Sequence, residues 1–269
     1  MNYDPYAALH SARRDGWARL SPMEFTTPSA ARLVEYASVR AGQNVLDVGC
    51  GTGTVAIAAE RTGAYVHGLD PEPSVLEESR WKAAAAGASI EFQRGDVEAL
   101  PFADGTFDVV LSQFGHIFAP HPDTAIQEML RVLKPGGRLA FTTWPPELLM
   151  GQILALAERY LSSRVGIASC SIRGTLEAVR AHLGDSVSDI EFDRDDILIP
   201  TPNLQKYCSN IEFTIAPITQ VVLMLAYDPV RLAEFRFQLE AVVAKWFSQN
   251  CVRQSYLLAR AVKRQKICP

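Results

Sequence analysis

The sequence is poor in the features that mark disulfide-stabilised, metal-binding and membrane-spanning proteins. Its 269 residues include five cysteines, an odd number, and no two of them form a C-x-x-C pair. This pattern favours neither a disulfide framework nor a zinc site, and it is typical of a reducing compartment. The longest apolar stretch, Ile218 to Tyr227, is too short to span a bilayer. We therefore expect a cytoplasmic protein without a metal and without membrane insertion.

An excess of positive charge is also absent. The chain has 26 Lys and Arg against 30 Asp and Glu, a formal net charge of −4. Such a balance provides no basic field for nucleic acid or anionic lipid. Its first residues, Met1 to Pro5, do not show the cationic and then apolar order of a secretory signal. We expect a small-molecule partner, no nucleic acid, and a monomer or homodimer.

What the sequence does contain is enough apolar material for a sizeable core. Hydrophobic residues make up 48% of the chain, with 17 glycines and 16 prolines to shape turns. This composition is typical of a globular enzyme. The length predicts one large domain or a domain with a substantial insertion.

The most informative stretch joins an apolar strand, Val45 to Val48, to a glycine-rich turn. Gly49, Gly51 and Gly53 occupy alternate positions, and a helical pattern follows. Glycines let the backbone turn tightly and let a ligand approach it closely. The helix then begins with free N–H groups facing that ligand. The pattern predicts a site for a nucleotide-like molecule.

Two interpretations of this turn compete. Counted from Gly51, it fits the G-x-G-x-x-G/A pattern of dinucleotide-binding folds. Counted from Gly49, with Asp47 at its head, it resembles the first motif of class I S-adenosylmethionine-dependent methyltransferases. A carboxylate at Asp47 would repel the pyrophosphate of a dinucleotide. It would tolerate or attract the sulfonium and ammonium of S-adenosylmethionine, so Asp47 favours the methyl donor.

The second predicted strand, Tyr65 to Leu69, ends in Asp70, which Pro71 follows. Asp70 lies about twenty residues beyond the glycines, where a carboxylate can accept hydrogen bonds from both ribose hydroxyls. NAD and S-adenosylmethionine share that ribose, so Asp70 indicates a nucleoside without choosing between them. The alternative is that Asp70 caps the next helix.

A third strand from Ile90 leads into a loop with the sequence Gly95-Asp96-Val97-Glu98-Ala99-Leu100-Pro101-Phe102. This loop closely resembles the adenine-binding loop of small-molecule methyltransferases. The resemblance implies that Asp96 accepts a hydrogen bond from the exocyclic amine and that the backbone N–H of Val97 meets the adenine ring.

A fourth, central strand from Phe107 delivers Ser112, Gln113, Phe114 and His116 to its carboxyl end, where ligands bind in open α/β sheets. We expect donor and acceptor to meet there, with Phe114 in the acceptor pocket. His116 is the candidate general base, because an imidazole titrates near neutral pH. A base is needed only if an acceptor proton must leave, so the alternative is a loop histidine that moves no proton.

Four motifs in this order, ending with Arg131-Val132-Leu133-Lys134-Pro135-Gly136-Gly137, resemble the ubiquinone/menaquinone-biosynthesis type of class I methyltransferases. The resemblance implies an α/β fold, a Rossmann-like seven-stranded, mostly parallel sheet flanked by helices, with one antiparallel strand near an edge. We interpret the last motif as scaffold, a helix end with Lys134 near the negative pole of the helix dipole. The resemblance implies these cofactor-binding residues: Asp47, Gly49, Cys50, Gly51, Thr52, Gly53, Asp70, Pro71, Asp96, Val97, Ser112 and Gln113.

The rest of the chain divides around that core, which we place at 29–199 plus 251–264. Residues 1–28 form an N-terminal cap segment, in which Tyr6 and Trp17 either line the acceptor pocket or only pack. Residues 200–250 separate the last two predicted strands and show two helical patterns, Ile211 to Tyr227 and Val230 to Phe247. Long connections of this kind are usually functional. We predict a helical lid insertion with Phe213 and Met224 in the acceptor pocket; the alternative is that its apolar residues only pack on the sheet.

These observations predict an S-adenosylmethionine-dependent methyltransferase that acts on a small, apolar molecule and releases S-adenosylhomocysteine. Oxygen is the first choice of acceptor atom, then nitrogen or carbon. One alternative is a nicotinamide-dependent oxidoreductase. Another is a protein that binds S-adenosylmethionine without turnover, because methyl transfer needs mainly alignment and a dry pocket and has no obligatory catalytic residue.

Overall fold

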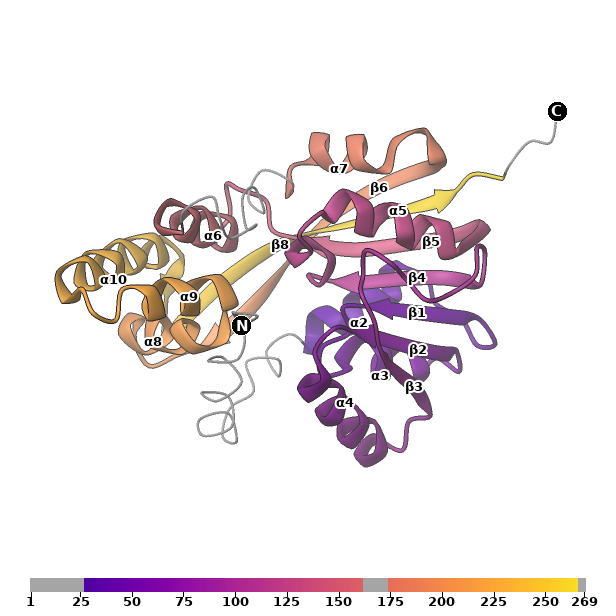
Figure 1. Cartoon of the computed structure of the whole chain (residues 1–269), viewed down its shortest axis with the longest axis horizontal. Helices are drawn as coiled ribbons and strands as arrows, with labels where there is room; N and C mark the ends of the chain where they lie inside the picture. The colour runs from indigo at the N-terminus through magenta and orange to yellow at the C-terminus, as the bar shows by residue number, and fades with distance from the viewer. Residues whose placement is uncertain (1–26, 162–173, 266–269) are drawn as a thin grey trace, which may run out of the picture.

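A computed structural model describes residues 27–161 and 174–265 and shows a single twisted sheet with helices on both faces (Figure 1). The strand order is β3-β2-β1-β4-β5-β8-β6, and a two-residue strand, β7, pairs with β8. Neighbours from β3 to β5 are parallel, whereas β8 is antiparallel to both β5 and β6. The predicted fold class, with one antiparallel strand near an edge, is confirmed. The strands are β1 (Asn44–Val48), β2 (Tyr65–Asp70), β3 (Ile90–Arg94), β4 (Phe107–Gln113), β5 (Leu133–Thr143), β6 (Val187–Pro200), β7 (Phe247–Ser248) and β8 (Cys251–Lys263).

Helices of the described residues cover both faces of the sheet. Alternation along β1 decides which face each residue serves: Val45 packs with the helices before and after β1, and Leu46 packs on the opposite face, against α5. Both faces of the central strands are therefore buried, as parallel sheets require. The helices are α2 (Thr27–Tyr36), α3 (Thr54–Glu60), α4 (Pro73–Ala86), α5 (Pro122–Val132), α6 (Leu149–Tyr160), α7 (Leu176–Leu183), α8 (Leu204–Thr214), α9 (Ala216–Met224) and α10 (Pro229–Val243), with 3-10 turns η3 (His116–Phe118), η5 (Gly184–Ser186) and η6 (Ala244–Trp246).

Four helices, α6, α8, α9 and α10, form a helical group beyond the carboxyl ends of β4 and β5 (Figure 1). The group sits on β6 and β8, because β8 pairs with β5 only from Leu257 to Val262 while its first half extends past β5 beside β6. Ile218, Phe235 and Leu239 are fully buried and belong to the same hydrophobic cluster as β1 and β4. The helical group therefore shares its core with the sheet.

The prediction of two helices between residues 211 and 247 is wrong, because three are present: α8, α9 and α10. Ile215 is extended and separates α8 from α9, and Pro217 lies in the first turn of α9. Proline has no N–H to donate and clashes with the preceding turn, so a helix begins at it and does not run through it.

Lys134 directly follows Leu133, the C-cap of α5, and its side chain pairs with β4. Its ammonium lies 2.7 Å from Asp108 Oδ1 at the start of β4. Besides Arg131 in the last turn, Lys263 from β8 lies at the carboxyl end of α5 and donates to the carbonyls of Arg131 and Leu133 at 3.2 and 2.6 Å. A lysine distant in sequence thus adds a favourable charge at the negative pole of the helix.

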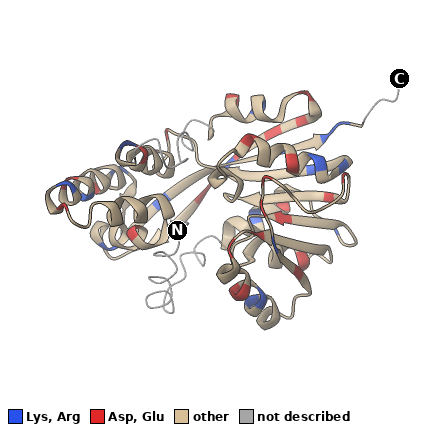
Figure 2. Ribbon diagram, viewed as in Figure 1, with Lys and Arg blue, Asp and Glu red and all other residues tan. Residues whose placement is uncertain are grey.

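Among residues 27–161 and 174–265, no helix combines the length and apolarity needed to cross a membrane, and no group of His, Cys, Asp and Glu side chains has the arrangement of a metal site. Figure 2 shows basic and acidic residues interspersed over the sheet and over the helical group. Asp193 and Asp196, from an acidic run in β6, pair with Arg32 and Arg253. The cytoplasmic location and the oligomeric state stay predictions.

Candidate active site

The glycine turn after β1 is hydrogen-bonded to the end of β2. The backbone N–H groups of Gly49 and Cys50 donate to the carbonyl of Leu69 at 2.8 and 3.0 Å. The N–H of Gly51 donates to Asp70 Oδ2 at 2.9 Å. All three glycines of the turn have positive φ, of 67°, 53° and 82°, a conformation that other residues adopt at a cost. The turn and Asp70 are therefore one structural unit.

The loop after β4 lies against this turn, backbone on backbone. A Cβ on Gly115 would lie 2.9 Å from Gly49 Cα, Gly49 O and Val48 O. A Cβ on Gly49 would in turn meet Gly115 Cα at 2.9 Å. Only glycine fits on either side of this contact. The two loops therefore meet backbone to backbone at one edge of the sheet, at the ends of β1 and β4. The chain reverses its strand order there, which is where open α/β sheets bind ligands.

Asp70 is fixed on both oxygens, with Oδ1 accepting from the N–H of Glu72 at 3.0 Å. It does not cap α4, because Glu72 is the N-cap and accepts from the N–H of Ser74. The capping interpretation of Asp70 is therefore wrong. Its carboxylate stands at the carboxyl end of β2, beside the glycine turn.

Asp47 is almost fully buried, with 1% of its surface exposed. Its Oδ2 accepts from the N–H of Ala56 in α3 at 3.0 Å. Its Oδ1 has no hydrogen-bond partner among the described residues. Burial raises the pKa of Asp47 to about 7, against the effect of the Ala56 N–H, and the nearby charge of Asp70 raises it further. A buried acceptor without a donor is costly, so Asp47 is suited to meet a donor or cation from a ligand.

The Asp96 loop is closed by its own backbone. Asp96 Oδ1 accepts from the N–H of Glu98 at 2.9 Å, and Val97 is buried. Glu98 in turn contacts His121 at the start of α5. Of the two carboxylate oxygens of Asp96, this turn uses Oδ1.

Arg131 from the fourth motif and Glu128, which lies outside the motifs, anchor the same loop to α5. Arg131 donates to the carbonyls of Leu100 and Phe102, both at 2.8 Å. It is held by Glu128, whose Oε2 also accepts from the N–H of Leu100 at 2.8 Å. The sequence predicts that the motif containing Arg131 is scaffold. It is scaffold for the Asp96 loop, a role that depends on tertiary contact.

The carboxyl end of β4 is tied to its neighbours by side chains. Ser112 Oγ donates to the carbonyl of Val48 at 2.9 Å, and Gln113 Nε2 donates to Ser29 Oγ of α2 at 2.8 Å. Phe114 has a positive φ of 57°, uncommon for an aromatic residue, and its ring stacks on Trp144 at 4.0 Å between centroids. Such outliers cluster at functional sites.

His116 is buried between β4 and α5. Its Nδ1 lies 3.2 Å from Ser112 Oγ, and its ring packs edge-on against Phe141 at 4.7 Å between centroids. Burial lowers the pKa of His116 to about 3, with a smaller contribution from His182. The imidazole is therefore neutral and weakly basic at pH 7, so the geometry favours the interpretation that His116 moves no proton.

This leads to a spectroscopic prediction. The ring proton resonances of His116, identified by their absence in His116→Gln, should stay constant from pH 5 to 8 in an NMR titration. A buried imidazole with a depressed pKa takes up its proton only in strong acid. A midpoint between pH 6 and 7 would contradict the burial argument and restore His116 as a general base.

The remaining predicted residues have diverse environments. Burial raises the pKa of the Cys50 thiol well above its usual value, helped by Asp47 and Asp70, so Cys50 stays protonated. Thr52 is buried and accepts from Lys82 at 3.3 Å. Pro71 is exposed. Phe213 and Met224 are 59% and 48% exposed, and their role in an acceptor pocket stays a prediction. Tyr6 and Trp17 lie outside the described residues.

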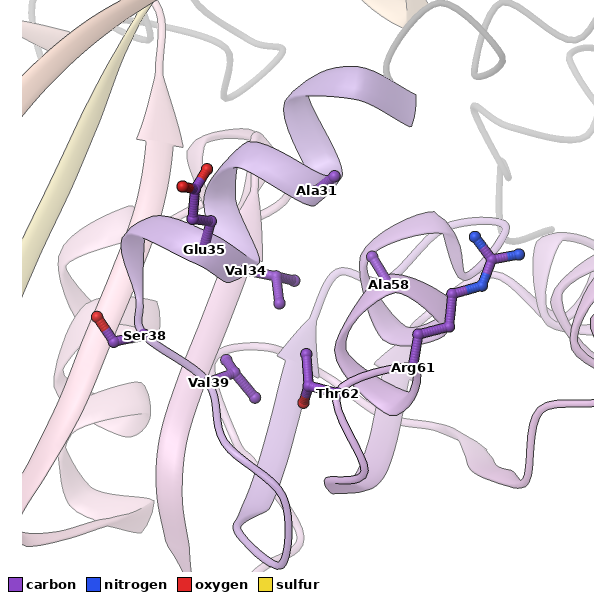
Figure 3. Close-up of a pocket in the computed structure, with 8 residues that line it drawn as sticks. All are labelled: Ala31, Val34, Glu35, Ser38, Val39, Ala58, Arg61 and Thr62. Atoms are coloured by element: carbon purple, nitrogen blue, oxygen red, sulfur yellow. The ribbon is translucent and has the colours of Figure 1, made fainter.

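A separate hollow of about 450 Å³ lies between the C-terminal halves of α2 and α3 (Figure 3). Val34, Val39 and Ala58 point into it, whereas Glu35 and Arg61 extend from its rim. Because α3 begins at the glycine turn and this hollow adjoins its other end, it is distinct from the candidate active site.

Comparison with known proteins agrees with this geometry. Residues 45–137 match the methyltransferase domain family. An uncharacterised protein of Mycobacterium tuberculosis is 31% identical over 264 residues, covering 96% of this chain and 95% of that protein. The demethylmenaquinone methyltransferase of Thermus thermophilus is 40% identical over 117 residues, 43% of this chain and 53% of that enzyme. The structure of the YcgJ protein of Bacillus subtilis has a TM-score of 0.62 at 20% identity, covering 88% of this chain and 99% of that one.

The chain therefore belongs to the class I S-adenosylmethionine-dependent methyltransferases. Within that class it is related to the menaquinone methyltransferases and other enzymes that methylate small molecules. This decides the choice between a methyl donor and a nicotinamide dinucleotide in favour of the methyl donor.

Proposed function

We propose that this chain transfers a methyl group from S-adenosylmethionine to a small, apolar acceptor, with oxygen as the first choice of acceptor atom and nitrogen or carbon after it. The observation that carries the proposal is the gathering of Asp47, Asp70 and the glycine turn at one edge of the sheet, with Gly51 bonded to Asp70. S-adenosylmethionine supplies a methyl group already activated by its sulfonium. The chain then has to bind, orient and exclude water.

The residues of this edge fit such a cofactor. Asp70 can accept hydrogen bonds from the ribose hydroxyls, and Asp96 with Val97 can hold the adenine. The orphaned Oδ1 of Asp47 can accept from the ammonium group of the methionine part. The close packing of Gly49 on Gly115 keeps side chains out of the space beside the turn, so the backbone itself forms the wall.

Three features support a small apolar acceptor. Phe114, Trp144 and Tyr256 form an aromatic cluster at the ends of β4, β5 and along β8. The formal net charge of −4 offers no field for nucleic acid. The Thermus thermophilus relative is named for demethylmenaquinone. We further propose that the methyltransferase core consists of residues 29–199 and 251–264. Residues 200–250 would be a helical insertion in its sequence that lies beside the acceptor pocket. Residues 1–28 would add a cap with Tyr6 and Trp17.

The primary test is calorimetric titration with S-adenosylhomocysteine. We expect micromolar binding by the wild type and an affinity at least about tenfold weaker in Asp70→Asn, because a charged hydrogen-bond site contributes about 1–3 kcal/mol. Asp123→Asn is the control for the loss of a carboxylate, since Asp123 lies outside the glycine turn and contacts His182 at 2.9 Å. It should bind as the wild type does.

Absence of S-adenosylhomocysteine binding by the wild type would refute the assigned cofactor site. Binding followed by a screen of small apolar alcohols, phenols and amines, with release of S-adenosylhomocysteine as the readout, would identify the acceptor. Binding without release on any acceptor would favour a protein that holds the cofactor without turnover.

A further inference from the structure

The carboxylate of Glu98 connects two segments of the proposed site. One is the Asp96 loop, which we assign to the cofactor, and the other is the segment 114–121, which we assign to the methyl acceptor. Glu98 belongs to the Asp96 loop, and His121 is the N-cap of α5, at the end of the segment 114–121. One oxygen of Glu98 accepts from the backbone N–H of His121, and the other lies 3.0 Å from His121 Nδ1. The Glu98 side chain is 17% exposed, whereas the His121 side chain is 74% exposed.

On the cofactor side, Glu98 is hydrogen-bonded to Asp96, the residue that we propose holds the adenine. Its backbone N–H donates to Asp96 Oδ1 at 2.9 Å, and buried Val97 lies between them. The next anchor along the chain is Leu100, whose N–H donates to Glu128. A ligand that fixes Asp96 therefore also fixes the backbone of Glu98.

On the acceptor side, the segment 114–121 is attached at its beginning, in its middle and at its end. Its beginning is held by the N–H of Phe114, which donates to Thr142 Oγ1 at 3.0 Å, and by the contact of Gly115 with Gly49. Its end is held at His121 by Glu98. In its middle, the N–H of His116 donates to Ser112 Oγ at 3.1 Å, the His116 ring packs against Phe141, and Ile117 is buried. The backbone bonds of Phe118 and Ala119 are local, to carbonyls three residues earlier. The contact with Glu98 therefore holds the last part of the segment, after Ile117.

The position of Glu98 is electrostatically favourable. Its carboxylate lies at the N-terminus of α5, where the helix dipole stabilises negative charge. Partial burial works to raise the pKa of Glu98, yet the N–H and imidazole of His121 lower it below its usual value. The group is charged at neutral pH, and the contact persists there.

We propose that Glu98 is a positioning residue that couples adenine binding at Asp96 and Val97 to the order of the acceptor-side segment 114–121. The inference rests on the proposed function for the identity of the ligand. Under this proposal, binding of the methyl donor orders the segment 114–121 on the acceptor side of the site. By linkage, a segment ordered by the cofactor strengthens cofactor binding by the same factor.

Hydrogen exchange followed by mass spectrometry tests the coupling in the wild type, with saturating adenosine as the probe. Adenosine has the adenine and ribose but lacks the methionine part that would lie beside Gly49 and Gly115. We expect exchange to slow in residues 95–102 and, by about fivefold or more, in 114–121. Slowing confined to 95–102 would overturn the proposal, and this measurement does not depend on any variant folding.

Substitution tests the role of the carboxylate. Glu98→Ala should lose the slowing in 114–121 at saturating S-adenosylhomocysteine and bind it about fivefold more weakly. Glu91→Ala is the matched control, because Glu91 also contacts a histidine, His67 at 3.4 Å, but lies on β3 outside the loop. Glu98→Gln retains an acceptor for the His121 N–H and should restore the slowing. Slowing in Glu98→Ala equal to the wild type would overturn the proposal.

The two proposals fail differently. If neither adenosine nor S-adenosylhomocysteine binds the wild type in calorimetry, the cofactor site is wrong. If both bind and Asp70→Asn weakens binding, but 114–121 does not respond to adenosine, the cofactor site stands and the role of Glu98 is wrong.

Discussion

Replacing Arg131 by methionine should lower the free energy of unfolding by about 3 kcal/mol and weaken S-adenosylhomocysteine binding at least about tenfold. Methionine keeps the aliphatic packing but removes two charge-assisted hydrogen bonds, to the carbonyls of Leu100 and Phe102. It also leaves the partly buried carboxylate of Glu128 without its cation. The loop between Asp96 and Phe102 then loses its attachment to α5. Urea unfolding and calorimetry measure the two effects.

Arg236→Met is the matched control. Arg236 also pairs with a buried glutamate, Glu212, through two hydrogen bonds of 2.8 and 2.7 Å. This pair joins α8 to α10 in the helical group, and the structure shows no hydrogen bond from Arg236 to a backbone carbonyl among the residues it describes. We expect Arg236→Met to lower stability but to leave S-adenosylhomocysteine affinity within about twofold of the wild type. Equal loss of affinity in both variants would mean that general destabilisation, and not the Asp96 loop, weakens binding.

Local geometry explains why the place of the glycine turn, Asp47 and Asp70 in the fold could be predicted from the sequence, while their roles in binding stay predictions. The glycine turn, Asp47 and Asp70 lie at the ends of two adjacent parallel strands, and short-range spacing determines where such ends fall. Their burial and bonding follow from the turn itself, as the contact of Gly51 with Asp70 shows. The break at Pro217 was also present in the sequence, because proline begins a helix more readily than it continues one.

Contacts across long sequence separations explain what could not be predicted. Arg131 reaches Leu100 across 31 positions, and Lys263 reaches Leu133 across 130. No local pattern distinguishes an arginine that anchors a loop from one that faces solvent. The burial of His116 likewise depends on packing against Phe141 of β5, and that packing, not the residue type, sets its pKa.

Replacing Asp47 by asparagine should raise the free energy of unfolding relative to the wild type, by an amount that grows by about 3 kcal/mol between pH 5 and pH 8. The pKa of Asp47 is about 7 in the folded protein and 3.8 without burial. Between these values the folded state holds a proton that the unfolded state has lost, so wild-type stability falls as pH rises. Asparagine does not titrate, and it keeps an acceptor for the Ala56 N–H. Urea unfolding at both pH values measures the difference.

Asp108→Asn should show the opposite trend, and in a more acidic range. Burial works to raise the pKa of Asp108, but the bond from Lys134 and the N–H of Asn44 lower it overall. Such a carboxylate contributes stability above its unfolded pKa and loses it in acid. Asp108→Asn should therefore destabilise the protein by nearly the same amount at pH 8 and pH 5, because the carboxylate is ionised in both states over that range, and by less as pH falls below the unfolded pKa of 3.8. Urea unfolding at pH 8, 5 and 3 measures this, and a change between pH 5 and 8 as large as that of Asp47→Asn would contradict the assignment of opposite pKa shifts.

The stability gained by Asp47→Asn should be offset by weaker cofactor binding. A charged carboxylate with a buried, unpartnered oxygen is a cost to the folded protein alone. That cost is recovered if a bound ammonium supplies the missing donor. The variant should therefore be more stable than the wild type at pH 8 and bind S-adenosylhomocysteine at least about tenfold more weakly there. In the wild type, affinity should rise with pH through 7, as Asp47 ionises. A variant that is more stable and binds equally well would show that Asp47 faces no ligand.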